Sequence, residues 1–302
     1  MRIIPIESIN SRASRYPEDF VSFAEAEYRL GIVDAALGIM ERRDKPIVLI
    51  TGPSGSGKTV TAHRLKAELQ KLGAVPCIIS MDNYFLPLEG SIDNVDLESP
   101  DRVDRALFQE QTEKILRGEE VVLPVFNFLK QDREEGSKYT RGKDEIVIFE
   151  GIHALNPDVT GKLLESANSV YVSVRTRIKN EKNNSTLHPS KIRLTRRFVR
   201  DKLYRGRTLL QTMEKFKSVE RGEKLYIMPY KKNARFDIDT LILYEPCVYK
   251  KHVLPELKEL AGKNPLVSEL AVFLEEMEDV GDELVPEFSL VREFIGGNSL
   301  ME

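Results

Sequence analysis

The chain has few cysteines, no long apolar run and little excess charge of either sign. Its 302 residues include two cysteines, Cys77 and Cys247, too few for a secreted domain built on paired disulfides. No apolar run reaches the roughly 18 residues of a membrane helix, and the N-terminus lacks the apolar core of a signal peptide. The formal net charge is -3, so no basic field favours nucleic acid or membranes. We therefore expect a cytoplasmic protein that binds neither nucleic acid nor a membrane.

Short apolar runs alternate with helical patterns along the middle of the chain. Strands are predicted at 47–50, 75–80, 146–149, 170–174 and 238–243, and helices at about 60–72, 103–116, 191–204 and 209–221. Strands that are apolar on both faces are typical of a parallel sheet covered on both sides. The pattern predicts an α/β fold over residues 46–250: a doubly wound, mainly parallel sheet with helices on both faces.

The two ends of the chain lie outside this pattern. Residues 1–45 contain a strand candidate at 2–6 and a helical stretch at about 18–42, and are expected to form an N-terminal extension. Residues 251–302 are helical and acidic, and are expected to form a C-terminal extension. Charge alone indicates no role for the acidic end, and a solvated helical cap is the simplest interpretation.

A glycine-rich segment follows the first central strand and precedes a helix. Residues 52–59 fit the pattern G-x-x-x-x-G-K-[ST] in full, which is a phosphate-binding loop. Glycines let backbone amides turn inward to hold a phosphate, and the helix N-terminus adds positive charge. In this pattern Lys58 supplies a charge to the β- and γ-phosphates and Thr59 a hydroxyl for Mg²⁺. The nucleotide-binding residues are expected to be Gly52, Ser54, Gly55, Ser56, Gly57, Lys58, Thr59 and Val60.

Two acidic residues follow other strands of the predicted sheet. Asp82 comes just after the strand at 75–80, and Glu150 ends the strand at 146–149. Ligands of a parallel sheet bind at the carboxyl ends of its strands. A kinase needs a carboxylate to accept the proton of the acceptor hydroxyl and oxygen ligands for Mg²⁺. Asp82 suits the base role, and Glu150 suits the metal, as a ligand or as a partner of one; a turn former and an ordinary strand-end residue are the respective alternatives.

Arginines are concentrated between residues 191 and 207. Arg193, Arg197 and Arg200 are spaced i, i+4, i+7 and share one helix face. Like charges in a row repel unless an anion is bound, and guanidinium groups bind phosphate in a bidentate manner. Alternatives are a solvated charged face and a nucleic-acid surface, although no interleaved aromatics support the latter. Beside a phosphate loop, the pattern favours a helical, arginine-rich lid at about 190–222.

Taken together, these segments resemble one family. The chain is similar to the uridine kinase / phosphoribulokinase family of P-loop kinases over residues 46–250. The ending at 289–297 also resembles the tail of longer bacterial members. The resemblance rests on the glycine loop and on the segments SMDNYF (80–85), SPDRVD (99–104), PVFNF (124–128), FEGIHAL (149–155), RRFVRD (196–201) and RGR (205–207).

The resemblance implies roles for individual residues. Asp82 would be the catalytic base and a metal-associated carboxylate, and Glu150 would organise Mg²⁺ with Thr59. Arg200 and Arg205 match lid arginines that contact ATP phosphates. Catalytic residues are expected to be Asp82, Lys58 and Arg197; metal residues Thr59, Asp82 and Glu150; and substrate residues Tyr84, Phe85, Phe126, Phe128, Gln131, Arg197 and Arg207.

The acceptor side departs from the family pattern. Phe126-Asn127-Phe128 stands where uridine kinases usually carry Tyr-Asp-Phe, and Gln131 falls where a histidine reads the pyrimidine. A pocket that hydrogen-bonds its substrate discriminates strongly, so such changes redirect specificity. The leading prediction is an ATP- and Mg²⁺-dependent kinase of a small-molecule alcohol, first a nucleoside and second a sugar or sugar phosphate. A nucleotide-hydrolysing switch or sensor is the alternative, and a homo-oligomer stays open.

Overall fold

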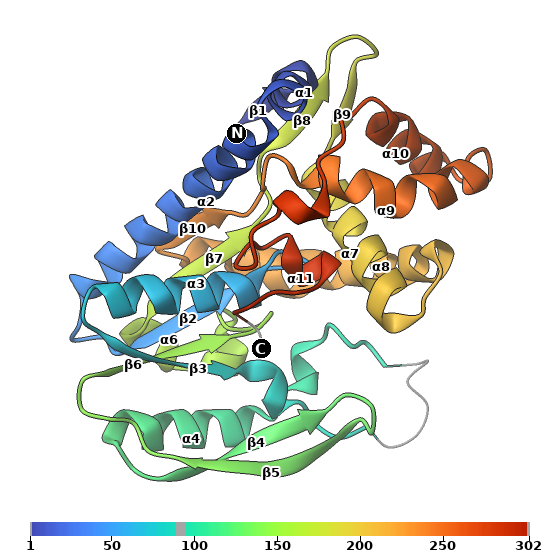
Figure 1. Ribbon diagram of the computed structural model, residues 1–302. Helices are drawn as coiled ribbons and strands as arrows, with labels where there is room; N and C mark the ends of the chain where they lie inside the picture. Colours follow the sequence, from blue (N-terminus) through green and yellow to red (C-terminus); the bar gives the residue numbers. More distant parts are fainter. Residues whose placement is uncertain (1, 89–94, 301–302) are drawn as a thin grey trace.

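The computed structural model describes residues 2–88 and 95–300, and a parallel sheet lies at its centre (Figure 1). In those residues the sheet has five strands in the order β10-β7-β2-β6-β3, and every neighbouring pair is parallel. The α/β prediction and the five strands are confirmed, although the last strand ends earlier than predicted. The strands are β2 (Ile47–Thr51), β3 (Val75–Ser80), β6 (Glu145–Glu150), β7 (Asn168–Ser173) and β10 (Phe236–Asp239).

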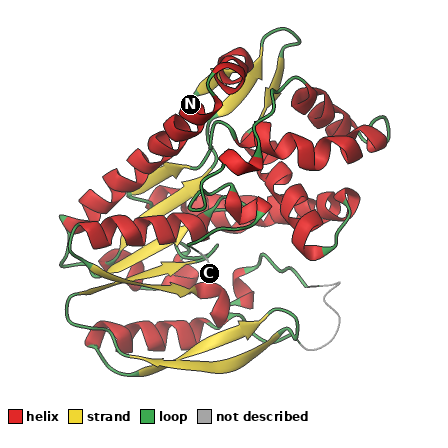
Figure 2. Ribbon diagram, viewed as in Figure 1, coloured by secondary structure: helices red, strands yellow, loops and turns green. Residues whose placement is uncertain are grey.

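Helices cover both faces of this sheet, because alternate residues of its strands point to opposite sides. In β2, Val48 and Ile50 belong to one apolar cluster, while Ile47 and Leu49 belong to another. The first cluster is covered by α2 (Pro17–Met40) and α3 (Lys58–Lys71). The second is covered by α4 (Arg105–Arg117), α5 (Pro157–Thr160) and α6 (Leu163–Ser166). Figure 2 shows this layered arrangement.

Two pairings of strands lie outside the central sheet. An antiparallel hairpin joins β4 (Val121–Asn127) to β5 (Asp132–Tyr139) beside α4. A small sheet has the order β1-β8-β9, from Ile3–Pro5, Arg177–Asn180 and Ser185–Leu187. Of these strands the sequence analysis named only β1, as the candidate at 2–6. β5 carries charged and polar residues over most of its length, so no apolar pattern indicated it.

The predicted arginine region folds as two helices, α7 (Pro189–Arg205) and α8 (Leu209–Gly222). α7 is packed against α8, α9 (Glu245–Leu260) and α11 (Arg292–Ile295). Ile192, Leu194 and Phe198 of α7 are each 1% exposed. The first helix of the predicted lid thus packs into the core.

The two terminal extensions contribute to the same core. One apolar cluster includes Ile9 of α1 (Ile6–Arg15), Tyr28 of α2, Leu270 of α10 (Pro265–Glu275) and Phe294 of α11. The expectation that the C-terminal region is a solvated cap is therefore wrong. Whether the three parts act as separate functional units stays a prediction. None of the helices in residues 2–88 and 95–300 is long and apolar enough to cross a membrane.

One buried acid ties these extensions to the sheet. Glu25 on α2, 5% exposed, accepts a hydrogen bond from Arg64 of α3, with 2.6 Å between Nη1 and Oε2. Its other oxygen accepts from the Tyr244 hydroxyl at 2.7 Å, and that hydroxyl lies 2.9 Å from Oγ of Ser289. An upstream helix, the helix after the glycine loop and the C-terminal segment therefore meet in one polar network.

Candidate active site

The glycine loop lies between β2 and α3, at the carboxyl edge of the sheet, as predicted. Gly55 and Gly57 have φ values of 75° and 84°, in the left-handed region that glycine adopts without strain. At Gly52 a Cβ atom would lie 1.9 Å from the carbonyl oxygen of Val172, so a side chain has no room. The loop shape depends on these positions. In the described part of the chain, the buried Ser56 hydroxyl has no hydrogen-bond partner.

The two predicted carboxylates come together at the ends of neighbouring strands. β3 and β6 pair so that Ser80 lies opposite Glu150, and the Ser80 hydroxyl donates to Oε1 of Glu150 at 3.0 Å. Asp82 follows in a short 3-10 turn (Met81–Tyr84). Burial and the charge of Glu150 raise the pKa of Asp82 to about 7, although Lys58 opposes the shift. The two acids are therefore close enough to disfavour simultaneous ionisation in the absence of a cation.

These groups fit the needs of a nucleotide and a magnesium ion. Mg²⁺ is usually held by one or two carboxylates, with phosphate oxygens and waters completing its shell. Asp82 and Glu150 supply two carboxylates, and Thr59 supplies a hydroxyl at the start of α3. Across residues 2–88 and 95–300, no group of three or more His, Cys, Asp or Glu residues is arranged to hold a metal by itself. Such a site would depend on the nucleotide for its remaining ligands.

Two of the three arginines predicted to share one face of α7 contact the glycine loop directly. Nη1 of Arg193 donates to the Ser54 carbonyl at 3.2 Å, and Nη1 of Arg197 donates to the Ser54 hydroxyl at 2.7 Å. Burial, together with neighbouring Arg200, lowers the pKa of Arg197 to about 10, so the group stays charged at neutral pH. The arginine face predicted from the i, i+4 spacing thus meets the loop.

The other predicted arginines gather around one buried acid. Asp201, fully buried, accepts from Arg200 at 3.0 Å and is paired with Arg205 at 3.5 Å and with Arg207 at 3.3 Å. Burial alone would raise the pKa of Asp201, but the arginines lower it. One carboxylate does not neutralise three guanidinium groups. The cluster keeps positive charge near the loop, as a lid that binds phosphate requires.

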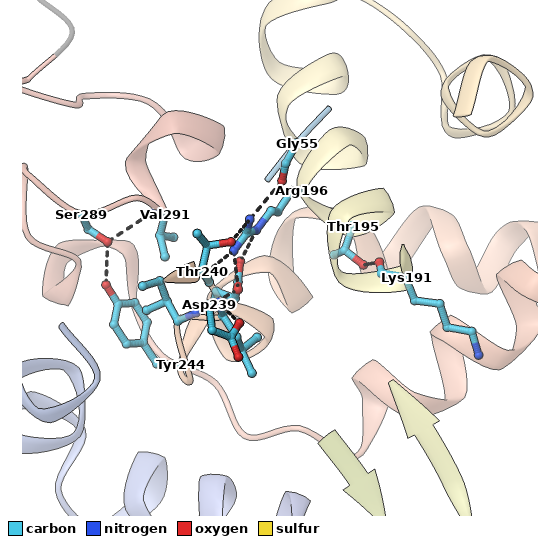
Figure 3. Close-up of polar contacts among 12 residues, drawn as sticks. Gly55, Lys191, Thr195, Arg196, Asp239, Thr240, Tyr244, Ser289 and Val291 are labelled. Atoms are coloured by element: carbon cyan, nitrogen blue, oxygen red, sulfur yellow. Dashed lines mark hydrogen bonds and ion pairs between the residues drawn. The ribbon is translucent and has the colours of Figure 1, made fainter. Parts of the chain in front are cut away.

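The sequence analysis did not single out Arg196 from its neighbours. It is fully buried and forms a two-pronged pair with Glu245, with 2.7 Å from Nε to Oε2 and 2.9 Å from Nη2 to Oε1. It also donates to the carbonyl oxygens of Gly55 at 3.0 Å and Thr240 at 2.5 Å. Figure 3 shows Arg196 beside Gly55 and Thr240. Arg196 therefore holds the backbone of the glycine loop at Gly55. Nothing in the arginine spacing separates this residue from Arg197.

The predicted acceptor residues are only partly brought together. Phe85, Phe126 and Phe128 form an edge-to-face cluster with ring centroids 5.1 to 6.4 Å apart. Phe128 is 56% exposed, while Phe126 is 5% exposed. Tyr84 is fully buried and its hydroxyl donates to Gln111 at 2.9 Å. Tyr84 therefore packs in the core, and Phe85 is the aromatic of that pair that reaches the cluster.

Gln131 makes its side-chain hydrogen bond within its own turn. It lies in the turn between β4 and β5 with φ 54°, and its Nε2 donates to the Phe128 carbonyl at 2.6 Å. The amide is engaged within its own turn. The structure thus links Gln131 to Phe128, a member of the aromatic cluster.

Two further residues join the site. Burial raises the pKa of Glu98, which lies near Lys58 and Arg197. His153, 2% exposed and three residues after Glu150, has no hydrogen-bond partner on either ring nitrogen among the residues described. Burial lowers the pKa of His153 to about 4, so the ring is neutral at pH 7. Glu98 directly precedes the segment at 99–104 and His153 lies within the segment at 149–155; both segments were quoted for the family resemblance, which was the signal available in the sequence.

Comparisons with known proteins agree with this geometry. The chain is 28% identical over 193 residues to a uridine kinase from Borrelia duttonii, covering 62% of this chain and 83% of that protein. It is 28% identical over 199 residues to a uridine kinase from Bacillus pumilus, covering 64% and 85%. A solved structure of a candidate fructose transport system kinase from Silicibacter sp. has a TM-score of 0.50 at 20% identity, covering 69% and 97%, and so shares the fold.

The family model of the phosphoribulokinase / uridine kinase family matches residues 47–243. That span contains the glycine loop, both carboxylates and the arginines of α7, and it ends before α9. The resemblance stated from the sequence is confirmed. The chain is a small-molecule kinase that belongs to the phosphoribulokinase / uridine kinase family.

Proposed function

We propose that this protein transfers the γ-phosphoryl group of ATP to a hydroxyl of a nucleoside such as uridine or cytidine. The observation that carries the proposal is the meeting of the glycine loop with Asp82 and Glu150 on adjacent strands. Phosphoryl transfer depends mainly on alignment and charge neutralisation, and this edge of the sheet has groups for both.

Each residue has a distinct task in this scheme. Lys58 and the loop amides hold the β- and γ-phosphates, and Arg200 and Arg205 contact the phosphates from the lid. Asp82 accepts the proton of the acceptor hydroxyl, and Arg197 and Arg207 reach the acceptor side. Thr59, Asp82 and Glu150 would hold Mg²⁺, which would supply positive charge to offset the charge that develops during transfer.

The nature of the acceptor rests on the aromatic cluster and on the relatives. The proteins matched at 28% identity are named uridine kinases, which supports a nucleoside. Phe85 and the exposed Phe128 offer ring faces on which a base could stack. However, Gln131 is engaged with Phe128 and gives no sign of reading a pyrimidine edge. This observation favours a sugar or sugar phosphate as the second candidate acceptor.

The proposal is tested by following ADP release from Mg·ATP with nucleosides, pentose phosphates and other small alcohols, beside an acceptor-free control. We expect release that depends on uridine or cytidine; stimulation only by another alcohol would transfer the proposal to that acceptor class. Equal release with and without every acceptor would refute transfer and favour a hydrolytic switch or sensor.

Variants assign the roles within the same assay. Asp82→Asn is expected to abolish transfer while ATP binding is retained, and Lys58→Ala to impair nucleotide binding and turnover together. Asp44→Asn, at an exposed position just before β2 and so at the end of that strand opposite the loop, is the matched control. If Asp82→Asn lost ATP binding together with activity, its assignment as the base would be wrong.

A further inference from the structure

A C-terminal segment that lies beyond the family match packs on the glycine loop. This segment, Ser289–Gly296, includes the short helix α11 beside α7 (Figure 1). A Cβ atom on Gly57 would lie 2.3 Å from Cδ1 of Leu290, so Leu290 rests on the last glycine of the loop. Leu290 is fully buried. The nucleotide site that we propose therefore has a neighbour from the far end of the chain.

Specific contacts hold this segment in place. The Ser289 hydroxyl lies 2.9 Å from the Tyr244 hydroxyl (Figure 3), and the Tyr204 hydroxyl of α7 donates to the Ile295 carbonyl at 2.6 Å. The guanidinium of Arg196 lies 5.4 Å from the ring centroid of Phe294. The segment thus accepts a hydrogen bond from α7 and contacts Arg196, which in turn donates to the glycine loop.

Glu293 brings a carboxylate into this cationic region. Its Oε2 is buried and, among the described residues, has no hydrogen-bond partner. Burial raises the pKa of Glu293, while Arg200, Arg196 and Lys58 favour its charged form and Glu150 opposes it.

Glu293 lies on α11, which packs against α7, the helix of Arg200. Leu290 of the same segment rests on Gly57, the residue before Lys58. The carboxylate is thus placed among groups proposed above to bind phosphate. A bound phosphate and this carboxylate would therefore compete for the same cations.

We propose that Glu293 is an affinity-determining residue of the nucleotide site, which weakens nucleotide binding by competing with phosphate for Arg200 and Lys58. The inference rests on the proposed function and adds a residue from outside the matched region. If so, the Glu293 carboxylate lowers the affinity for a nucleotide more strongly when the nucleotide carries more phosphates. A role confined to packing would affect all nucleotides equally.

The test compares Glu293→Gln, which keeps size and removes charge, with Glu287→Gln, an exposed acid of the preceding turn. Binding of ADP and AMP to the full chain is measured by calorimetry at pH 8.5, which favours the carboxylate, with thermal melting as a folding check. We expect Glu293→Gln to bind ADP about tenfold more tightly than the unaltered chain. The gain for AMP should be smaller, and Glu287→Gln should match the unaltered chain.

A second variant tests the named partner. In an Arg200→Ala background, Glu293→Gln should gain clearly less ADP affinity, because one of the contested cations is gone. Unchanged or weaker ADP binding by Glu293→Gln would overturn the inference, as would an equal gain for ADP and AMP. Failure of the unaltered chain to bind either nucleotide would refute the proposed function as well, so the two failures are distinct.

Discussion

The buried pair of Arg196 and Glu245 should be one of the most sensitive points of the molecule. Both side chains are fully buried. Burial by itself would lower the pKa of Arg196, but Glu245 raises it above the usual range. Removing one member of such a pair leaves an uncompensated buried charge, which costs about 3–5 kcal/mol. For a chain of this length the corresponding fall in melting temperature is about 5–8 °C.

We therefore expect Arg196→Met to lower stability in a denaturant titration by that amount and to weaken nucleotide binding, because the Gly55 carbonyl loses its donor. The matched control is Glu275→Gln, which breaks an ion pair with Lys258 whose side chains are 51% and 57% exposed. That change should cost less than about 1 kcal/mol. The reasoning would be refuted if the two variants lost equal stability. It would also fail if Arg196→Met with Glu245→Leu were no more stable than Arg196→Met alone.

Three further predictions concern the loop, the carboxylates and the aromatic cluster. Gly52→Ala should reduce nucleotide affinity at least about tenfold in calorimetry, since its Cβ meets backbone; Gly31→Ala, in a helix with 3.7 Å to the nearest atom, should be neutral or stabilising. In the metal-free chain, NMR titration should give Asp82 a pKa of about 7, and Glu150→Gln should lower it. Because the pKa of Asp82 is raised from 3.8, this carboxyl adds to the free energy of unfolding below about pH 4, and that stabilisation is lost as the pH rises through about 7. Phe85→Ala should raise KM for the acceptor about tenfold and leave ATP affinity unchanged; a rise in KM for ATP instead would contradict its placement.

Much of the catalytic edge could be predicted from the sequence, because each feature has a local pattern. The glycine loop depends on spacing within eight residues, and the register of Ser80 with Glu150 follows from two apolar strands that end in polar residues. The hairpin strand Asp132–Tyr139 could not be found in this way. Its side chains are mostly polar, so its pairing with β4 is decided by tertiary contacts and leaves no periodic signal.

The sequence also could not show which of two adjacent, similar residues contacts the site. Tyr84 and Phe85 are both aromatic, yet the Tyr84 hydroxyl bonds to Gln111 while the Phe85 ring packs in the aromatic cluster. Arg196 and Arg197 differ in the same way, since helix rotation turns one toward Glu245 and the other toward Ser54. The sequence shows which residue types are present, while orientation depends on packing between segments that are distant along the chain.

The network around Glu25 has a consequence for how the protein is made. Arg64, on the helix that follows the glycine loop, pairs with a residue 39 positions upstream, and that residue also holds Tyr244, which lies against Ser289. A nascent chain leaves the ribosome from its N-terminus, so this network stays incomplete until Ser289 has been synthesised. The region matched by the family is for this reason not a module that could be moved by itself to another protein. In such a fragment Arg64 would lack Glu25, and the apolar surface that α2 and the C-terminal helices cover would be exposed to solvent.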